Sequence, residues 1–110
     1  MKEFVESLKT GAFRIPACNS CHVKVWPPSH FCPACYSATS LEKVEAIGTL
    51  VEFASSHVRN REGLFGIIDM NGIRIVGSLG ETVPKIGAKM KLSSCGVRED
   101  GTLYYEFEQA

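Results

Sequence analysis

The sequence predicts a mainly β protein, in which a short N-terminal helix precedes a cysteine-rich ribbon and a small C-terminal β-barrel. Two Cys-x-x-Cys pairs lie within residues 18–35, and four of the five prolines lie within residues 12–40, which excludes long helices there. Residues 48–108 consist of short runs with alternating apolar side chains, separated by turn signals. We therefore expect a helix in 1–12, a ribbon in 13–40 and a barrel in 41–110.

The N-terminal helix is predicted over residues 2–10. Phe4, Val5 and Leu8 fall on one face, and Gly11 is a typical stop. A helix of this length is marginally stable alone and needs a surface to pack against. Two interpretations remain open: the helix covers its own domain, or it docks on a partner through Phe4 and Leu8.

The C-terminal half reads as β-strands joined by two hairpin turns. Asn71-Gly72 lies between two apolar runs, which is a strong hairpin signal, and Asp100-Gly101 supplies a second turn. About five short strands in this length favour a closed barrel, because closure removes exposed edges. The residues expected to face the interior are Ile73, Ile75, Leu79, Leu103, Tyr105 and Phe107, whereas Tyr104, Glu106 and Glu108 are expected to face outward.

The four cysteines of the ribbon predict a metal site. Cys18 and Cys21 form one tight knuckle, Cys32 and Cys35 form another, and the ten residues between them can fold back as a hairpin. Four thiolates complete the tetrahedral shell that zinc prefers, so we expect one zinc ion in a rubredoxin-like ribbon. A closed four-cysteine shell leaves no position for water or substrate, which makes the zinc structural. Iron in the same shell and a pair of disulfides are the alternatives.

Other residues with chemical potential have no obvious catalytic partners. His22 and His30 flank the knuckles and could replace a thiolate, but four cysteines already complete the shell. His57 is predicted to be a surface histidine. Cys95 lies alone on a predicted strand, without the base and anion-binding environment that a nucleophile needs. No phosphate-binding loop, nucleophile elbow or pair of catalytic carboxylates is found, so we expect a protein that is not an enzyme.

Two further segments are candidate interaction sites. Trp26, Pro27, Pro28 and Phe31 form an apolar tip between the knuckles. This tip either packs inside the protein or is an exposed partner interface, where aromatic residues are enriched. Arg59 and Arg61 form a small basic loop, and they are candidates to contact the phosphates of a nucleotide-bearing ligand such as an acyl-CoA.

Composition bounds the compartment and the partners. Hydrophobic residues make up 45% and charged residues 22%, with 12 basic and 12 acidic side chains. Zero net charge disfavours a nucleic-acid binder, which usually carries a basic excess. The N-terminus lacks the apolar core of a signal peptide, and no apolar run approaches the ~18 residues of a membrane span. We therefore expect a cytoplasmic protein that does not enter membranes.

The ordered set of motifs resembles the zinc-ribbon/OB-fold family long filed as domain of unknown function 35. The resemblance covers residues 2–108. It includes Pro27-Pro28, the Phe-Cys-Pro-x-Cys element at 31–35, and the barrel start Ile47-Gly48-Thr49. One departure is that the family usually has glycine after each knuckle, whereas this chain has His22 and Tyr36.

The resemblance implies an OB-fold barrel and a non-catalytic partner of thiolase-superfamily enzymes. The expected partners are acetoacetyl-CoA thiolase and hydroxymethylglutaryl-CoA synthase, bridged in a hetero-oligomeric complex of the mevalonate pathway. Direct transfer of the intermediate would relieve the unfavourable thiolase equilibrium. Two alternatives remain: an obligatory small subunit of another thiolase or acyltransferase acting on aromatic-pathway acyl-CoAs, and a single-stranded nucleic-acid binder, a role that OB barrels also serve.

Overall fold

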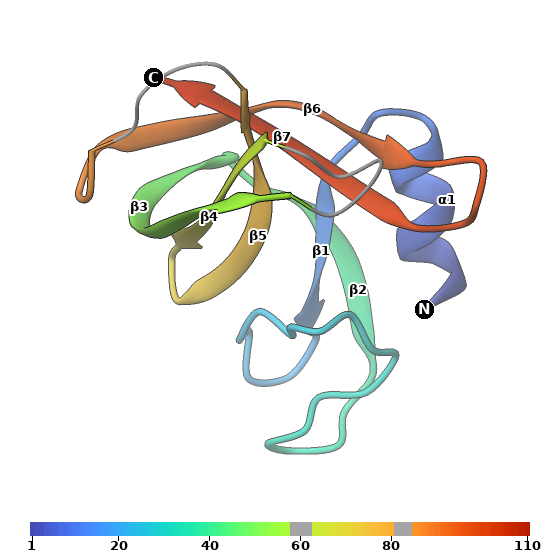
Figure 1. Cartoon of the computed structure of the whole chain (residues 1–110). Coiled ribbons are helices and arrows are strands. Elements are labelled where there is room, and N and C mark those ends of the chain that lie inside the picture. The colour runs from blue at the N-terminus through green and yellow to red at the C-terminus, as the bar shows by residue number, and fades with distance from the viewer. Residues whose placement is uncertain (58–62, 81–84) are drawn as a thin grey trace. The chain divides into compact units, whose positions relative to one another are not determined.

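The computed structural model describes residues 1–57, 63–80 and 85–110, which form two compact units, Met1–Glu45 and Ala46–Ala110 (Figure 1). The first unit contains helix α1 (Lys2–Lys9) and strands β1 (Arg14–Cys18) and β2 (Thr39–Lys43). The second contains β3 (Ile47–Ser56), β4 (Gly63–Met70), β5 (Ile73–Gly80), β6 (Lys89–Val97) and β7 (Leu103–Gln109). The predicted mainly β class is confirmed.

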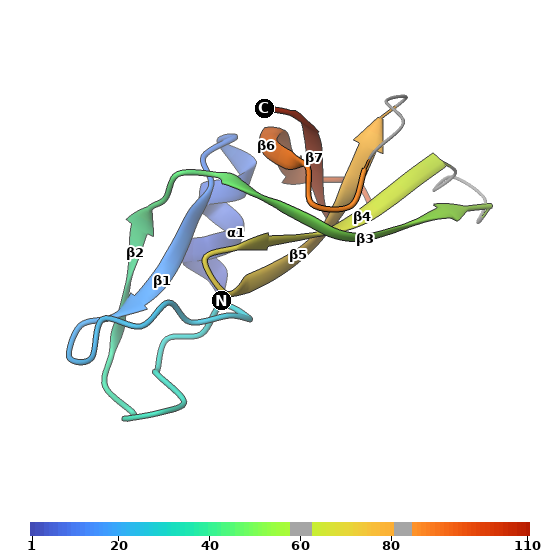
Figure 2. The ribbon, with the colours of Figure 1, turned by 90° about the vertical axis from the view of Figure 1, so that its left-hand side faces the viewer.

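In the first unit, β1 and β2 form a two-stranded antiparallel sheet. The register runs from Arg14 opposite Lys43 to Cys18 opposite Thr39. Residues 41–45, which we expected at the start of the barrel, therefore belong with the ribbon because β2 pairs with β1. The chain between the two strands extends past one end of the sheet as two loops (Figure 2), which carry Cys21, Cys32 and Cys35, while Cys18 ends β1.

Helix α1 buries its apolar face within the first unit. Phe4 is 2% exposed and Leu8 is 0% exposed. Gly11 adopts φ +78° and its N–H donates to the Leu8 carbonyl at 2.8 Å, which ends the helix where the glycine predicted. The buried Ser7 hydroxyl donates to the Ala12 carbonyl at 2.8 Å, so this polar group is satisfied. Of the two interpretations of the helix, the structure supports the one in which it covers its own domain.

The second unit is a closed barrel with strand order β3-β4-β5-β7-β6. The β5–β7 pair is parallel and the other pairs are antiparallel. A five-stranded Greek-key barrel of this kind is the OB-fold. The barrel expected from the strand pattern is therefore present, and its connectivity is that of the fold which the family resemblance implied.

Both predicted hairpin turns are confirmed. Asn71 and Gly72 adopt φ values of +55° and +89°, as a two-residue type I′ turn between β4 and β5 requires. The turn between β6 and β7 contains Gly101 at φ +87°, and the Arg98 N–H donates to the Thr102 carbonyl at 2.8 Å. Each turn sets the register of the two strands that it joins, β4 with β5 and β6 with β7.

The barrel interior matches most of the predicted inward residues. Ile73, Ile75 and Leu79 of β5 are buried, as is Phe107 of β7. Tyr105 is half-buried, and burial is the main cause that raises its pKa to about 12. The prediction was wrong for Leu103, which is 36% exposed because it begins β7 beside the hairpin turn.

Two glycines at strand contacts provide a matched stability test. A Cβ added at Gly48 would lie 2.5 Å from the Asp69 backbone carbonyl, whereas one at Gly96 would meet the outer end of the Tyr104 side chain at 2.7 Å. Because the strand backbone cannot move aside, we expect Gly48→Ala to lower the free energy of unfolding by about 3 kcal/mol. Gly96→Ala should cost less than about 1 kcal/mol, since Tyr104 can shift. Urea unfolding followed by far-ultraviolet circular dichroism measures both, and equal losses would contradict this account.

Candidate metal centre

The two cysteine knuckles have the same backbone geometry. The Cys18 N–H donates to the Val23 carbonyl and the His22 N–H donates back to the Cys18 carbonyl, at 2.9 and 3.0 Å. In the second knuckle, the Cys32 N–H donates to Ser37 and the Tyr36 N–H donates to Cys32, at 2.9 and 2.8 Å. Each loop thus holds two sulfurs on one side of a tight turn.

His22 and Tyr36 occupy the turn positions where the family usually has glycine. Their φ values are +63° and +61°, the left-handed conformation that side chains disfavour. Placing a non-glycine residue there costs roughly 1–2 kcal/mol. Both turns therefore keep the knuckle geometry despite the substitutions, and the departure from the family pattern leaves the ligand arrangement intact.

The knuckles bring the four predicted cysteine ligands together. Their Sγ atoms all lie within 4.8 Å of one another, with 3.3 Å between Cys18 and Cys35, 3.7 Å between Cys21 and Cys32, and 3.8 Å between Cys21 and Cys35. Tetrahedral zinc–sulfur bonds of about 2.3 Å place sulfurs about 3.8 Å apart. None of the four is in a disulfide. The donor set fits one structural zinc ion, as predicted.

Hydrogen bonds prepare some of these thiols for metal binding. The backbone N–H of Cys21 donates to the Cys18 sulfur at 3.3 Å and lowers the pKa of Cys18. Hydrogen bonds from the Ser37 side chain and backbone lower the pKa of Cys35 to about 6. The Val23 N–H lowers the pKa of Cys21, but the neighbouring thiols, Cys18 foremost, and burial outweigh it and raise that pKa to about 11. Four thiolates this close repel one another, and a dication relieves that repulsion.

The site combines a buried and an exposed cysteine from each knuckle. Cys18 and Cys32 are buried and form an apolar cluster with Val25, whereas Cys21 and Cys35 are exposed. The first cysteine of each pair thus anchors the loop to the unit's core. The exposed pair leaves one side of the centre at the surface.

The remaining candidate ligands lie apart from the four sulfurs. His30 instead approaches Glu3 of α1, with 2.6 Å between Nε2 and Oε2. His22 and His57 are exposed. Cys95 is buried in the barrel, and desolvation raises the pKa of its thiol, which disfavours the reactive thiolate.

The structure divides the predicted interface residues into two groups. The expectation that Phe4 and Leu8 face a partner is corrected, because both are buried in the first unit. Trp26 lies in the same aromatic cluster, with its ring centroid 5.5 Å from Phe4 and 6.5 Å from Phe13. Pro27 is exposed, Pro28 is half-buried and Phe31 is 62% exposed.

Sequence reasoning missed the most exposed aromatic residue of the ribbon. Tyr36 is 80% exposed on the second knuckle. Its place directly after Cys35, where glycine is usual, was the available signal. Arg59 and Arg61, the candidate phosphate contacts, lie outside the described residues.

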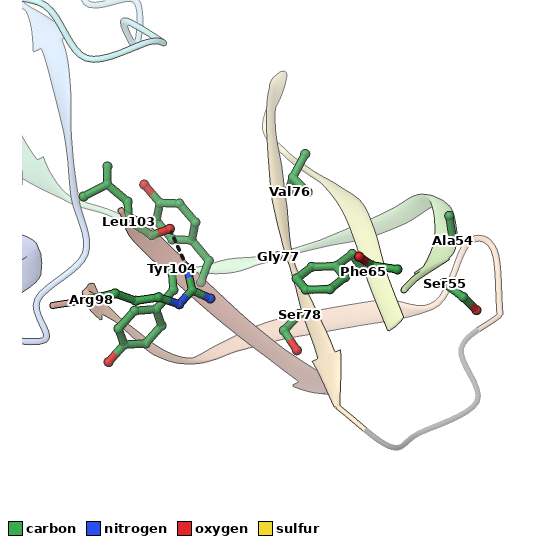
Figure 3. A pocket seen from close by; sticks show the side chains of 11 residues that line it. Ala54, Ser55, Phe65, Val76, Gly77, Ser78, Arg98, Leu103 and Tyr104 are labelled. Atoms are coloured by element: carbon green, nitrogen blue, oxygen red, sulfur yellow. Dashed lines mark hydrogen bonds between the residues drawn. The ribbon is translucent and has the colours of Figure 1, made fainter. Parts of the chain in front are cut away.

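The barrel carries a second candidate site, a groove of about 420 Å³. Figure 3 shows Phe65 beside Ala54 and Ser55 on one side of β5, and Arg98 with Leu103 and Tyr104 on the other. No local sequence pattern indicates this groove, because its lining comes from separate strands. Across the described residues, no helix combines the length and apolar character needed to cross a membrane.

Comparisons with known proteins agree with the ribbon and the barrel. Residues 5–42 match the family model described as ChsH2, rubredoxin-like zinc ribbon domain. A solved structure described as "Ltp2-ChsH2(DUF35) aldolase" is similar, with a TM-score of 0.80 and 19% identity, over 98% of this chain and 92% of that chain. At this identity the likeness shows the fold. The comparison with curated proteins gave no match.

Fold and site together define a zinc-ribbon/OB-barrel protein with one structural zinc bound by Cys18, Cys21, Cys32 and Cys35. The match over residues 5–42 and the shared fold agree with the resemblance to the zinc-ribbon/OB-fold proteins of domain of unknown function 35 that the sequence indicated.

Proposed function

We propose that this chain is a non-catalytic accessory subunit of an acyl-CoA enzyme of the thiolase superfamily. The observation that carries the proposal is the likeness of ribbon and barrel to a chain described as part of an Ltp2-ChsH2(DUF35) aldolase. The metal site is compatible with this role, because four thiolates fill the shell and leave the zinc no position for a substrate.

The specific partners we propose are acetoacetyl-CoA thiolase and hydroxymethylglutaryl-CoA synthase. The family resemblance supports this pair, and the physical benefit is passage of an unfavourable intermediate directly to the enzyme that consumes it. A thiolase or acyltransferase of an aromatic acyl-CoA pathway is the alternative partner. Arg59 and Arg61 remain proposed contacts to CoA phosphates in either complex.

The partner surface that we propose is the exposed part of the ribbon loops, which we call the ribbon tip and define as Pro27, Phe31 and Tyr36. Exposed aromatic side chains are the residues most enriched among interface hot spots. Tyr36 belongs to this surface because its side chain is 80% exposed on the second knuckle. Trp26 is half-buried and lies in the aromatic cluster with Phe4 and Phe13.

A binding experiment tests the proposal. The zinc-loaded chain should form a stable complex with thiolase, synthase or both in gel filtration. We expect Phe31→Ala and Tyr36→Ala each to weaken that complex by about 2 kcal/mol in calorimetry, a typical hot-spot loss. Phe53→Ala is the matched control, since Phe53 is also partly exposed but lies on β3 of the barrel.

Three outcomes would count against this function. The first is that the chain elutes alone from gel filtration in every mixture. The second is that the isolated chain itself turns over acetoacetyl-CoA. The third is micromolar binding to single-stranded nucleic acid with a steep dependence on salt, which would favour the nucleic-acid alternative.

A further inference from the structure

The barrel groove lies across four neighbouring strands. Its lining comes from the end of β3, from β4, from β5 and from the start of β7, together with Arg98 of the β6–β7 turn. In the barrel these four strands are adjacent in that order. Neighbouring strands lie about 4.8 Å apart, so a molecule lying across all four would extend about 14 Å. The volume, about 420 Å³, is within the range of small-molecule sites.

The middle of the groove is apolar and open to solvent. Val76 is 61% exposed and Leu103 is 36% exposed, although both are large aliphatic side chains. Phe65, which is half-buried, lies with Ala54 on the side of β5 opposite to Leu103. Covering such surface with an apolar molecule is favourable, at about 25 cal/mol per Å².

Within residues 1–57, 63–80 and 85–110, Arg98 is the one charged residue that lines the groove. Its Nη1 donates to the Leu103 carbonyl at 3.4 Å and lies 3.5 Å from the Thr102 hydroxyl, and its guanidinium lies 5.3 Å from the centre of the Tyr104 ring. These contacts fix the guanidinium at one end of the groove (Figure 3). Among the described residues, no contact engages Nη2 or Nε, so N–H donors remain for a bidentate bond to an anion.

In the described part of the chain, two carboxylates lie next to Arg98 in sequence. Glu99 and Asp100 follow Arg98 in the turn but do not line the groove. The Asp100 carboxylate instead accepts hydrogen bonds from the Thr102 N–H and hydroxyl, at 3.0 and 2.6 Å. The groove therefore presents a cation at one end of an apolar channel, with serine hydroxyls at the β3 end.

We propose that this groove binds an elongated, apolar small molecule with an anionic group at one end. The anion pairs with Arg98, and the apolar body lies over Leu103, Val76 and Phe65 toward β3. This site is separate from the zinc centre, and the proposal does not depend on the accessory function proposed above. Carboxylate is the anion we expect, because its two oxygens match the planar guanidinium.

Titration of the zinc-loaded chain with dodecanoate, below the concentration at which it forms micelles, tests the proposal. We expect saturable binding by calorimetry. In ¹H–¹⁵N spectra, amide shifts should be confined to groove residues such as Ser55, Val76 and Tyr104. Dodecanol and dodecyltrimethylammonium have the same chain without the anion, and each should bind at least about tenfold more weakly if the charged pair contributes as such pairs usually do.

Matched variants assign the contact. Arg98→Gln should weaken dodecanoate binding at least about tenfold, and it should remove the preference over dodecanol. Arg74→Gln is the control, because Arg74 is an exposed arginine on β5 that pairs with Asp69 outside the groove. Val76→Glu, at an exposed position, should also reduce binding by placing a like charge beside the ligand.

The proposal is overturned if dodecanoate does not bind, if dodecanol binds equally well, or if Arg98→Gln and Arg74→Gln behave alike. Complex formation with thiolase-type enzymes is measured separately. If dodecanoate does not bind, the complex can still form, and if no complex forms, dodecanoate binding can still be measured.

Discussion

Cys18→Ser and Cys35→Ser are each expected to release the zinc and unfold the ribbon. Structural zinc in small domains contributes an apparent ~10–16 kcal/mol to folding. The first unit has few other sources of stability, because its sheet has two strands and its knuckle turns at His22 and Tyr36 are strained. Three remaining thiols cannot complete the tetrahedral shell, so the loops lose the ion that holds them together.

Elemental analysis and tryptophan fluorescence measure this effect. Wild type should contain one zinc per chain, and both variants should contain little. Trp26 is the sole tryptophan and lies in the first unit, so its emission reports the ribbon alone. Cys95→Ser is the matched control: Cys95 lies in the barrel, outside the four-sulfur cluster, and its loss should leave the zinc content unchanged. A metal-free wild type with a native emission spectrum would refute the structural role of zinc.

Phe4→Ala should have the second-largest effect, lowering the free energy of unfolding of the first unit by about 3–5 kcal/mol. The Phe4 ring is 2% exposed and meets Phe13 and Trp26 edge to face, at centroid separations of 6.4 and 5.5 Å. Truncation leaves a cavity and also removes two aromatic contacts, each of which adds roughly 0.5–1.5 kcal/mol. Urea unfolding monitored through Trp26 measures the loss.

Phe31→Ala is the control that separates a core role from an interface role. Phe31 is 62% exposed, so its truncation should change the stability of the isolated chain by less than about 0.5 kcal/mol. If Phe4→Ala left stability unchanged but abolished partner binding, the original expectation of an exposed helix face would be restored. If Phe4→Ala lowers the stability of the first unit and Phe31→Ala weakens only partner binding, Phe4 belongs to the core and Phe31 to the interface.

Short stretches of sequence were enough to predict the metal ligands, the helix end, the two hairpin turns and the buried face of β5. The two Cys-x-x-Cys pairs defined the ligand set because each pair needs only a tight turn to aim its sulfurs. Gly11, Asn71-Gly72 and Gly101 marked the helix end and the two hairpins, since each supplies a left-handed conformation that most residues avoid. Alternation along β5 predicted its buried face, because the period of two survives any arrangement of neighbouring strands.

Only the tertiary structure showed which side chains are buried and where the groove lies, because these features depend on contacts between residues that are distant in sequence. The apolar face of α1 looks the same whether it covers its own unit or a second protein, and only the packing of Phe4 against Phe13 and Trp26 distinguishes the two. The exposure of Leu103 follows from its place beside a turn. The groove needed β3, β4, β5 and β7 to become neighbours, and the parallel β5–β7 pair that completes it leaves no local signature. Burial and cavities arise from non-local contacts, whereas turns and metal knuckles are encoded within a few residues.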